Sequence, residues 1–168
     1  MITISLDEIR EHGPCADGWV TLLDHLGKTK ADDVRFPLTV VLDSNGLDDV
    51  LWCCKCLPQY AREWRLFAVW CARQVQHLMT DQRSVDALDV AEQYANGEAT
   101  NEKLMSTRAA ARAAWDDSWA AAWAAGDDSG AAAGGAAWNA WAAWGTCKPE
   151  QAEEFRRVCS ETEERLAK

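Results

Sequence analysis

The sequence predicts an all-α protein, either a multi-helix bundle or a short helical-repeat stack. Helix-capping patterns recur along the chain, apolar residues recur at helical spacing, and the one strand-like segment has no evident partner. The 168 residues suit a single helical domain. Within it we expect short helices over 1–58, main helices over 59–147 and an amphipathic C-terminal helix over 148–168.

The chain is expected to open with two short helices. Residues 5–8, Ser-Leu-Asp-Glu, match a capping box, in which each of the two end residues binds the backbone N–H of the other. The helix that starts there must end at Gly13-Pro14, because proline cannot continue it. A second helix is expected over 16–26, with Gly27 as its C-terminal stop and a polar loop after it.

Two further short helices are expected before residue 58. The third helix covers 38–43, with Pro37 in its first turn and Asn45-Gly46 closing it. A strand over 38–42 is the alternative, because this segment is rich in β-branched residues and Asn-Gly is also a hairpin signal. The fourth helix covers 47–56 and ends before a proline.

The segment 61–79 carries the clearest helical pattern in the chain. Its apolar residues follow the spacing of a buried stripe, and we expect that stripe to contain Trp64, Phe67, Ala68, Cys71, Val75 and Leu78. Thr80 or Asp81 can cap the next helix, which ends at Gly97.

Three more helices are expected in the remainder of the chain. Thr100 caps a long helix that runs to about Ala125. A turn over 126–130 then leads into an Ala-rich helix that ends at Trp144. Pro149 opens the last, amphipathic helix.

Six of the ten tryptophans lie in the Ala-rich region, in two sets at helical spacing: Trp115, Trp119 and Trp123, then Trp138, Trp141 and Trp144. Each set forms a ridge along one side of its helix. The two helices form either an antiparallel pair with interlocked Trp and Ala side chains, or an exposed ridge that binds another protein. The same ridge offers a route to a homodimer.

Acidic residues are the second feature, since 27 Asp and Glu against 17 Lys and Arg give a net charge of −10. This balance excludes a simple nucleic-acid binder, which needs a basic surface. Four Asp-Asp pairs stand out: Asp32 and Asp33, Asp48 and Asp49, Asp116 and Asp117, Asp127 and Asp128. They serve either solubility and helix N-termini, or an acidic face that docks on a basic groove.

No catalytic pattern is found, so we expect neither an enzyme nor a cofactor. The thiol cluster Cys53, Cys54 and Cys56 lacks the second ligand pair of a zinc site, so small buried residues are the preferred interpretation and metal binding the alternative. The odd number of seven cysteines, without a secretory signal or an apolar membrane span, predicts reduced thiols in the cytoplasm.

Three segments carry a resemblance to a known group of proteins. Residues 65–73 (RLFAVWCAR), 78–84 (LMTDQRS) and 91–100 (AEQYANGEAT) resemble a recurrent element in uncharacterised proteins of bacteria and their phages, some of them labelled immunity proteins. That group also has an Ala-rich helical tail after this element. The resemblance covers roughly half of the chain and assigns no catalytic residue. By analogy, it implies an anti-defence factor such as an anti-CRISPR.

Taken together, these features favour a non-enzymatic phage or mobile-element protein. We expect it to inhibit a nucleic-acid-handling host protein of a defence system through an acidic, DNA-mimic-like surface. In this hypothesis the Asp pairs supply charge, and Trp115, Trp119 and Trp123 supply hot-spot area. The alternative is an immunity protein that neutralises a toxin by direct binding. Neither hypothesis involves direct contact with nucleic acid or a membrane.

Overall fold

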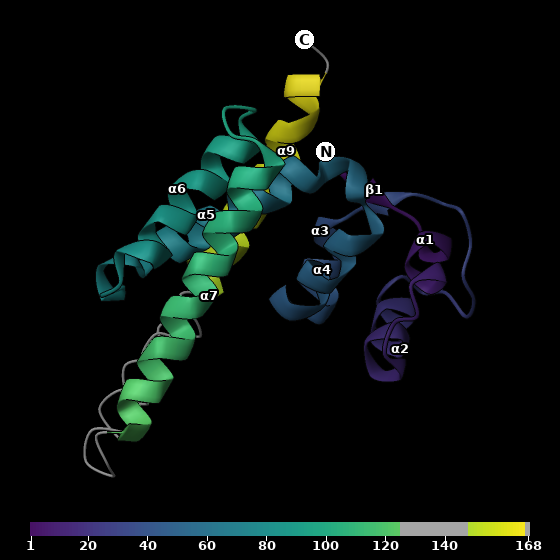
Figure 1. Cartoon of the computed structure of the whole chain (residues 1–168). Coiled ribbons are helices and arrows are strands. Elements are labelled where there is room, and N and C mark those ends of the chain that lie inside the picture. Colours follow the sequence, from purple (N-terminus) through teal and green to yellow (C-terminus); the bar gives the residue numbers. More distant parts are fainter. Residues whose placement is uncertain (125–147, 167–168) are drawn as a thin grey trace. The chain divides into compact units, whose positions relative to one another are not determined.

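A computed structural model of the chain describes residues 1–124 and 148–166 (Figure 1). It confirms the predicted all-α class, with eight α-helices and one two-stranded sheet among the described residues. The chain divides into two compact units. Unit 1 combines residues 1–64 with 149–168, and unit 2 covers residues 65–148.

Unit 1 begins with a strand and two helices. Strand β1 (Thr3–Ile4) leads into α1 (Leu6–Glu11), where the predicted capping box is present. The hydroxyl of Ser5 accepts from the Glu8 N–H at 3.3 Å, and the Glu8 carboxylate accepts from the Ser5 N–H at 2.8 Å. Helix α2 (Ala16–His25) follows, and Gly27 ends it at φ 63° as expected, a conformation that suits glycine.

The segment after the loop corrects one expectation. Residues 39–45 are helical, as preferred over a strand, and form α3 (Thr39–Asn45). Pro37, however, lies in strand β2 (Phe36–Pro37), where Pro37 pairs with Thr3 and Phe36 with Ile4 in an antiparallel ladder. A helix that included Pro37 would break this pairing, which holds Phe36 in the core.

The cysteine-containing helix is shorter than expected. Helix α4 (Leu47–Cys53) gives way to a 3₁₀ turn, η1 (Cys54–Cys56), and a second one, η2 (Pro58–Tyr60), follows. The predicted helix over 47–56 is therefore correct in position, but its last turn is tightened. Cys53 and Cys56 are buried, and Cys54 is half-buried.

Unit 1 is completed by the C-terminal helix α9 (Lys148–Leu166), which begins beside Pro149 as predicted. Phe155, Cys159 and Thr162 on this helix are almost fully buried, and the carbonyl of Cys159 accepts a hydrogen bond from the Ile2 N–H at 3.0 Å. The core of unit 1 thus joins the two ends of the sequence. Its largest buried members are Phe155, Ile2, Ile4, Leu6, Ile9, Leu38 and Leu57.

Helix α5 (Ala61–Gln74) ends five residues earlier than the predicted Met79 and is followed by a short 3₁₀ turn, η3 (Gln76–Leu78). The predicted buried stripe is wrong in part. Phe67 and Cys71 are buried, but Ala68 is exposed and Leu78 is 43% exposed. Helical periodicity stops at the break after Gln74, so spacing no longer places Leu78 on the buried face.

Two long helices make up most of the described part of unit 2 and lie side by side (Figure 1). Helix α6 (Gln82–Ala95) is capped by Asp81, whose carboxylate accepts from the Arg83 N–H at 2.8 Å. Helix α7 (Asn101–Ala124) follows a turn at Gly97, and the Thr100 hydroxyl accepts from the Lys103 N–H as predicted. The expected turn over 126–130 and the helix to Trp144 lie outside the described residues.

Candidate functional site

The first Asp pair lies in the loop after α2, and its two members differ. The carboxylate of Asp32 accepts from Lys28 Nζ at 2.7 Å through both oxygens, and from the Val34 N–H at 3.2 Å. The hydrogen bond from Lys28 is the main reason that the pKa of Asp32 lies below its ordinary value. Asp33 is exposed. Only one charge of this pair therefore lacks a counter-ion nearby.

The second pair lies in the first turn of α4, where carboxylates are stabilised by the helix dipole. Asp48 is exposed. Asp49 Oδ2 accepts from Asn45 Nδ2 at 2.8 Å, and the same Nδ2 donates to the Gly18 carbonyl at 2.8 Å. Asp49 therefore belongs to a polar link between α2, α3 and α4, and it does not project freely into solvent.

The remaining predicted site residues lie in unit 2 or outside the description. Asp116 is exposed on α7 and lines a surface depression with Arg108 and Arg112. The backbones of Trp115, Asp117, Trp119 and Trp123 belong to α7, but their side chains lie outside the described residues. Asp127 and Asp128 lie outside them entirely.

A further set of exposed carboxylates in unit 1 consists of four single acids that were not selected from the sequence, together with Asp33 of the first pair. We name Asp7, Glu11, Asp17, Asp24 and Asp33 the α1–α2 acidic surface; all five side chains are exposed. Within the described residues, none of these five carboxylates takes part in an ion pair or a hydrogen bond. Arg10 is the only Lys or Arg on these two helices. The sequence signal for this surface was the helical spacing of seven residues from Asp17 to Asp24, which places both side chains on one face of α2.

A cavity of about 90 Å³ lies between α2, α3 and α4 of the same unit. Its walls are mainly apolar and include Trp19, Leu22, Val41 and Trp52, together with Asn45 and Asp49. Cys15, which is exposed, also lines it, so the cavity reaches the surface. This pocket and the α1–α2 acidic surface share helix α2.

Burial favours the protonated form of the thiols in unit 1. Burial raises the pKa of Cys53 and of Cys159 to about 12, because a thiolate loses its hydration there. Burial also raises the pKa of Cys54, whose sulfur lies 3.5 Å from the Val50 carbonyl oxygen. Within residues 1–124 and 148–166, no three His, Cys, Asp or Glu side chains gather as metal ligands would.

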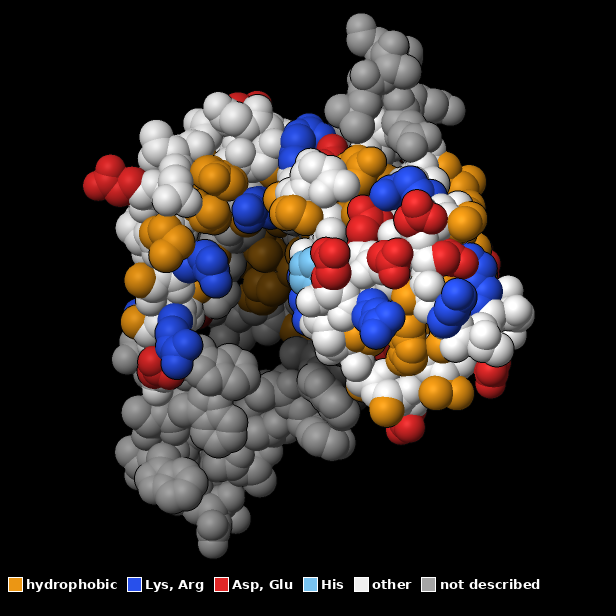
Figure 2. Space-filling model, turned by 90° about the vertical axis from the view of Figure 1, so that its right-hand side faces the viewer, with side chains coloured by type: hydrophobic (Ala, Val, Ile, Leu, Met, Phe, Trp, Pro, Cys, Tyr) orange, Lys and Arg blue, Asp and Glu red, His pale blue; other side chains and the backbone are white. Residues whose placement is uncertain are grey.

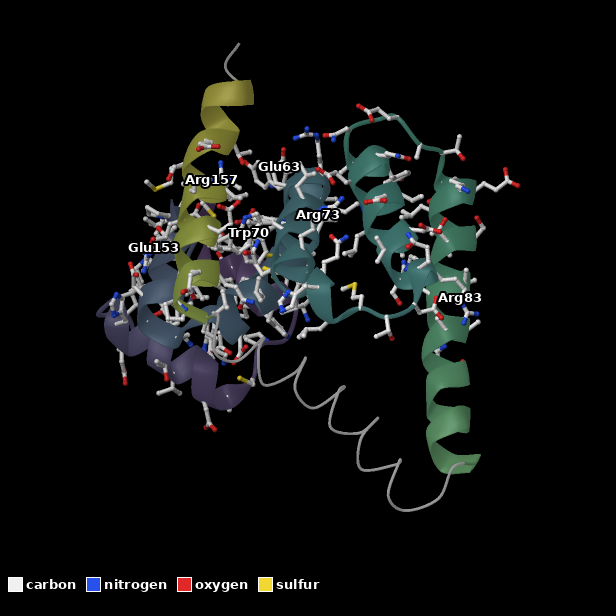
Figure 3. All side chains as sticks on the ribbon, turned by 90° about the vertical axis from the view of Figure 1, so that its left-hand side faces the viewer. Glu63, Trp70, Arg73, Arg83, Glu153 and Arg157 are labelled. Carbon is white, nitrogen blue, oxygen red and sulfur yellow. The ribbon has the colours of Figure 1, made fainter. Side chains whose placement is uncertain are left out.

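In unit 2, three acidic groups are paired with arginines: Asp81, Asp89 and Glu92. Arg73 on α5 reaches Asp89 at 2.9 Å and Glu92 at 2.6 Å on α6 (Figure 3), and the hydrogen bonds, first of all that to Glu92, raise the pKa of its guanidinium. Arg65 stacks over the Tyr94 ring at 4.8 Å. Figure 2 faces the side on which Figure 1 labels α1 and α2, and it shows acidic side chains interspersed with basic ones there.

Comparison with known proteins finds no matching family model, curated protein or solved structure. A search of the described helices for one long and apolar enough to cross a membrane finds none. The α1–α2 acidic surface and the adjacent cavity together form the candidate site.

Proposed function

We propose that this protein is a non-enzymatic inhibitor that binds the basic, nucleic-acid-binding surface of a host defence protein of the CRISPR type. The α1–α2 acidic surface carries the proposal. Its five carboxylates are exposed and, within the described residues, have no ion pair, so their charge acts outward on an approaching partner. Unit 1 as a whole has 17 acidic against 10 basic residues.

Physical chemistry favours a basic partner for such a surface. Like-charged carboxylates on two neighbouring helices attract a cationic groove over about 10 Å at physiological salt, which speeds encounter more than it strengthens the final complex. Asp32 and Asp49 contribute less to this attraction than predicted, because their carboxylates already accept hydrogen bonds from Lys28 and Asn45. The proposal therefore places the functional charge on the five carboxylates of the α1–α2 acidic surface.

A charge-reversal experiment tests the proposal. The double variant Asp17→Lys, Asp24→Lys is compared with the wild type for its ability to displace DNA or guide RNA from a panel of purified CRISPR effectors and restriction enzymes. We expect one member of the panel to lose nucleic-acid binding, with an association rate that falls as salt rises. The double variant should associate more slowly, since it repels the basic groove.

The matched control is the double variant Glu98→Lys, Glu102→Lys, which reverses two exposed carboxylates in unit 2 and so changes the net charge by the same amount. Its association rate should stay close to that of the wild type. An unaffected panel, or association that does not depend on salt, contradicts the proposal. A partner toxin that is neutralised without loss of nucleic-acid binding would instead identify an immunity protein.

A further inference from the structure

The cavity between α2, α3 and α4 combines aromatic walls with a single charge. Trp19 on α2 and Trp52 on α4 line it, and Asp49 is the only charged residue among its lining residues. No Lys, Arg or His contributes to the lining. Its volume of about 90 Å³ equals roughly three water molecules, the size of one small polar group with part of its stem.

The carboxylate of Asp49 is fixed in position at this cavity. Its Oδ2 atom accepts from Asn45 Nδ2 at 2.8 Å, and Asn45 in turn donates to the Gly18 carbonyl on α2. A Cβ atom at Gly18 would lie 2.6 Å from Asp49 Oδ2 and 3.0 Å from Cys15 Sγ. A glycine inside a helix lowers its stability, and here it leaves the space that the carboxylate and the cavity occupy.

We propose that this cavity holds one arginine side chain of the partner, with the guanidinium on Asp49 and the apolar stem against Trp19 and Trp52. Charge complementarity selects this occupant, because an arginine supplies a cation for the sole carboxylate and a flat, weakly hydrated group for the indole rings. The ring of Trp52 already attracts a cation of this chain, since Lys55 Nζ lies 3.7 Å from its centroid.

The exposed residues around the cavity agree with a cationic occupant. Asp17 precedes Gly18 on α2 and Asp48 precedes Asp49 on α4, and both are exposed. The arginine pocket also rests on the proposed function, in that it assigns a specific contact to the basic partner. The long stem of arginine suits a pocket with apolar walls and a charged end.

Binding of N-acetyl-arginine amide, followed by ¹H–¹⁵N NMR of the indole and backbone N–H groups, tests this pocket without any partner protein. We expect saturable shifts at Trp19, Trp52 and Gly18, with an affinity on the order of 1 mM for so small a ligand. N-acetyl-citrulline amide, which has the same shape without the charge, should bind at least about tenfold more weakly. N-acetyl-leucine amide serves as the apolar competitor.

Two variants and one control make the result decisive. Asp49→Asn should abolish the arginine shifts, whereas Asp48→Asn, which removes the same charge from the neighbouring residue, should leave them in place. Gly18→Ala should also weaken binding, because the added Cβ displaces the carboxylate. Spectra that otherwise match the wild type show that each variant is folded.

Leucine binding as tightly as arginine, or arginine shifts that persist in Asp49→Asn, would overturn the arginine pocket. These outcomes are separable from the charge-reversal experiment. Arginine shifts lost in Asp49→Asn, with no inhibited partner in the panel, would support the pocket and contradict the proposed function. Salt-dependent inhibition that is unchanged in Asp49→Asn would support the proposed function and contradict the arginine pocket.

Discussion

Identical side chains in unit 1 have different roles because their neighbours differ. The carboxylates of Asp32 and Asp49 lie within 2.8 Å of a donor nitrogen, whereas those of Asp17 and Asp24 face solvent. Local hydrogen bonds hold the first two in place, with Asp49 at the wall of the cavity, and the last two are exposed to an approaching partner. Adjacency in the sequence, which selected the Asp pairs, carries no information on the donors that reach them from four residues away.

Cysteine shows the same dependence on surroundings. Cys53 and Cys159 are buried, and burial raises the pKa of each thiol to about 12 from an ordinary 9.0. Cys15 is exposed at the start of α2. Since the thiolate is the reactive form, the three residues should differ widely in reactivity although all are reduced.

Alkylation with iodoacetamide at pH 8 should therefore modify Cys15 before Cys53 and Cys159 in the native protein. At this pH the fraction of thiolate at Cys53 and Cys159 is about a thousandfold lower than for a thiol with the ordinary pKa of 9.0, and their sulfurs are shielded as well. Peptide mass spectrometry over time measures the three rates. In denaturant all three should react alike, which provides the control. A native rate at Cys53 close to that at Cys15 would contradict the buried, protonated thiol.

At the scale of the element, the N-terminal cap of α1 also connects this helix to the strand β2 region. The Glu8 carboxylate accepts from the Ser5 N–H and from Arg35 Nη1 at 2.9 Å. Burial, the largest single influence, opposes ionisation of Glu8, but the hydrogen bonds from Arg35 and Ser5 together outweigh it. The pKa of Glu8 thus lies below its ordinary value of 4.5.

Replacing Glu8 by alanine should reduce the free energy of unfolding by about 1 kcal/mol at neutral pH. A carboxyl whose pKa is lowered in the folded state stabilises the fold above pH 4.5 and loses this effect as pH falls below it. The difference between wild type and Glu8→Ala should therefore shrink towards about pH 3.

Urea unfolding at several pH values measures this difference. Glu11→Ala on the same helix is the matched control, because Glu11 is exposed and lacks an ion pair within the described residues. Its effect on the free energy of unfolding should be small. A Glu8→Ala difference that stays constant with pH would show that Arg35 and Ser5 do not stabilise the ionised carboxylate.

Local sequence patterns predicted the described helices well, whereas contacts between residues far apart in the sequence could not be predicted. The caps at Ser5, Asp81 and Thr100 act within three residues, so the pattern of neighbouring residues suffices to find them. The pairing of Phe36–Pro37 with Thr3–Ile4 spans more than thirty positions and has only two residues per strand. Likewise, exposure of Ala68 depends on which helices surround α5, which periodicity alone does not specify.

At the scale of the whole molecule, unit 1 is built from both ends of the chain. Helix α9 contributes Phe155 and Cys159 to a core that otherwise comes from the first 64 residues. The Phe155 ring stacks on Trp64 with centroids 5.7 Å apart and planes 8° apart. Arg156 on α9 also pairs with Asp43 on α3 at 2.6 Å. The α1–α2 acidic surface and the arginine pocket therefore depend on a helix that follows them by more than ninety residues.

Replacing Phe155 by alanine should lower the free energy of unfolding by about 3–5 kcal/mol, since the side chain is fully buried and its removal leaves a cavity beside Trp64. Amide hydrogen exchange should increase throughout α1–α4, because their core loses its central ring. Glu153→Ala changes an exposed residue of the same helix (Figure 3) and should cost less than about 0.5 kcal/mol. Urea unfolding followed by circular dichroism compares the two variants, and equal costs would mean that α9 does not complete unit 1.

With a core that needs α9, removal of residues 149–168 should abolish binding of N-acetyl-arginine amide. The same truncation should remove the protection of the α2 and α4 amides from hydrogen exchange.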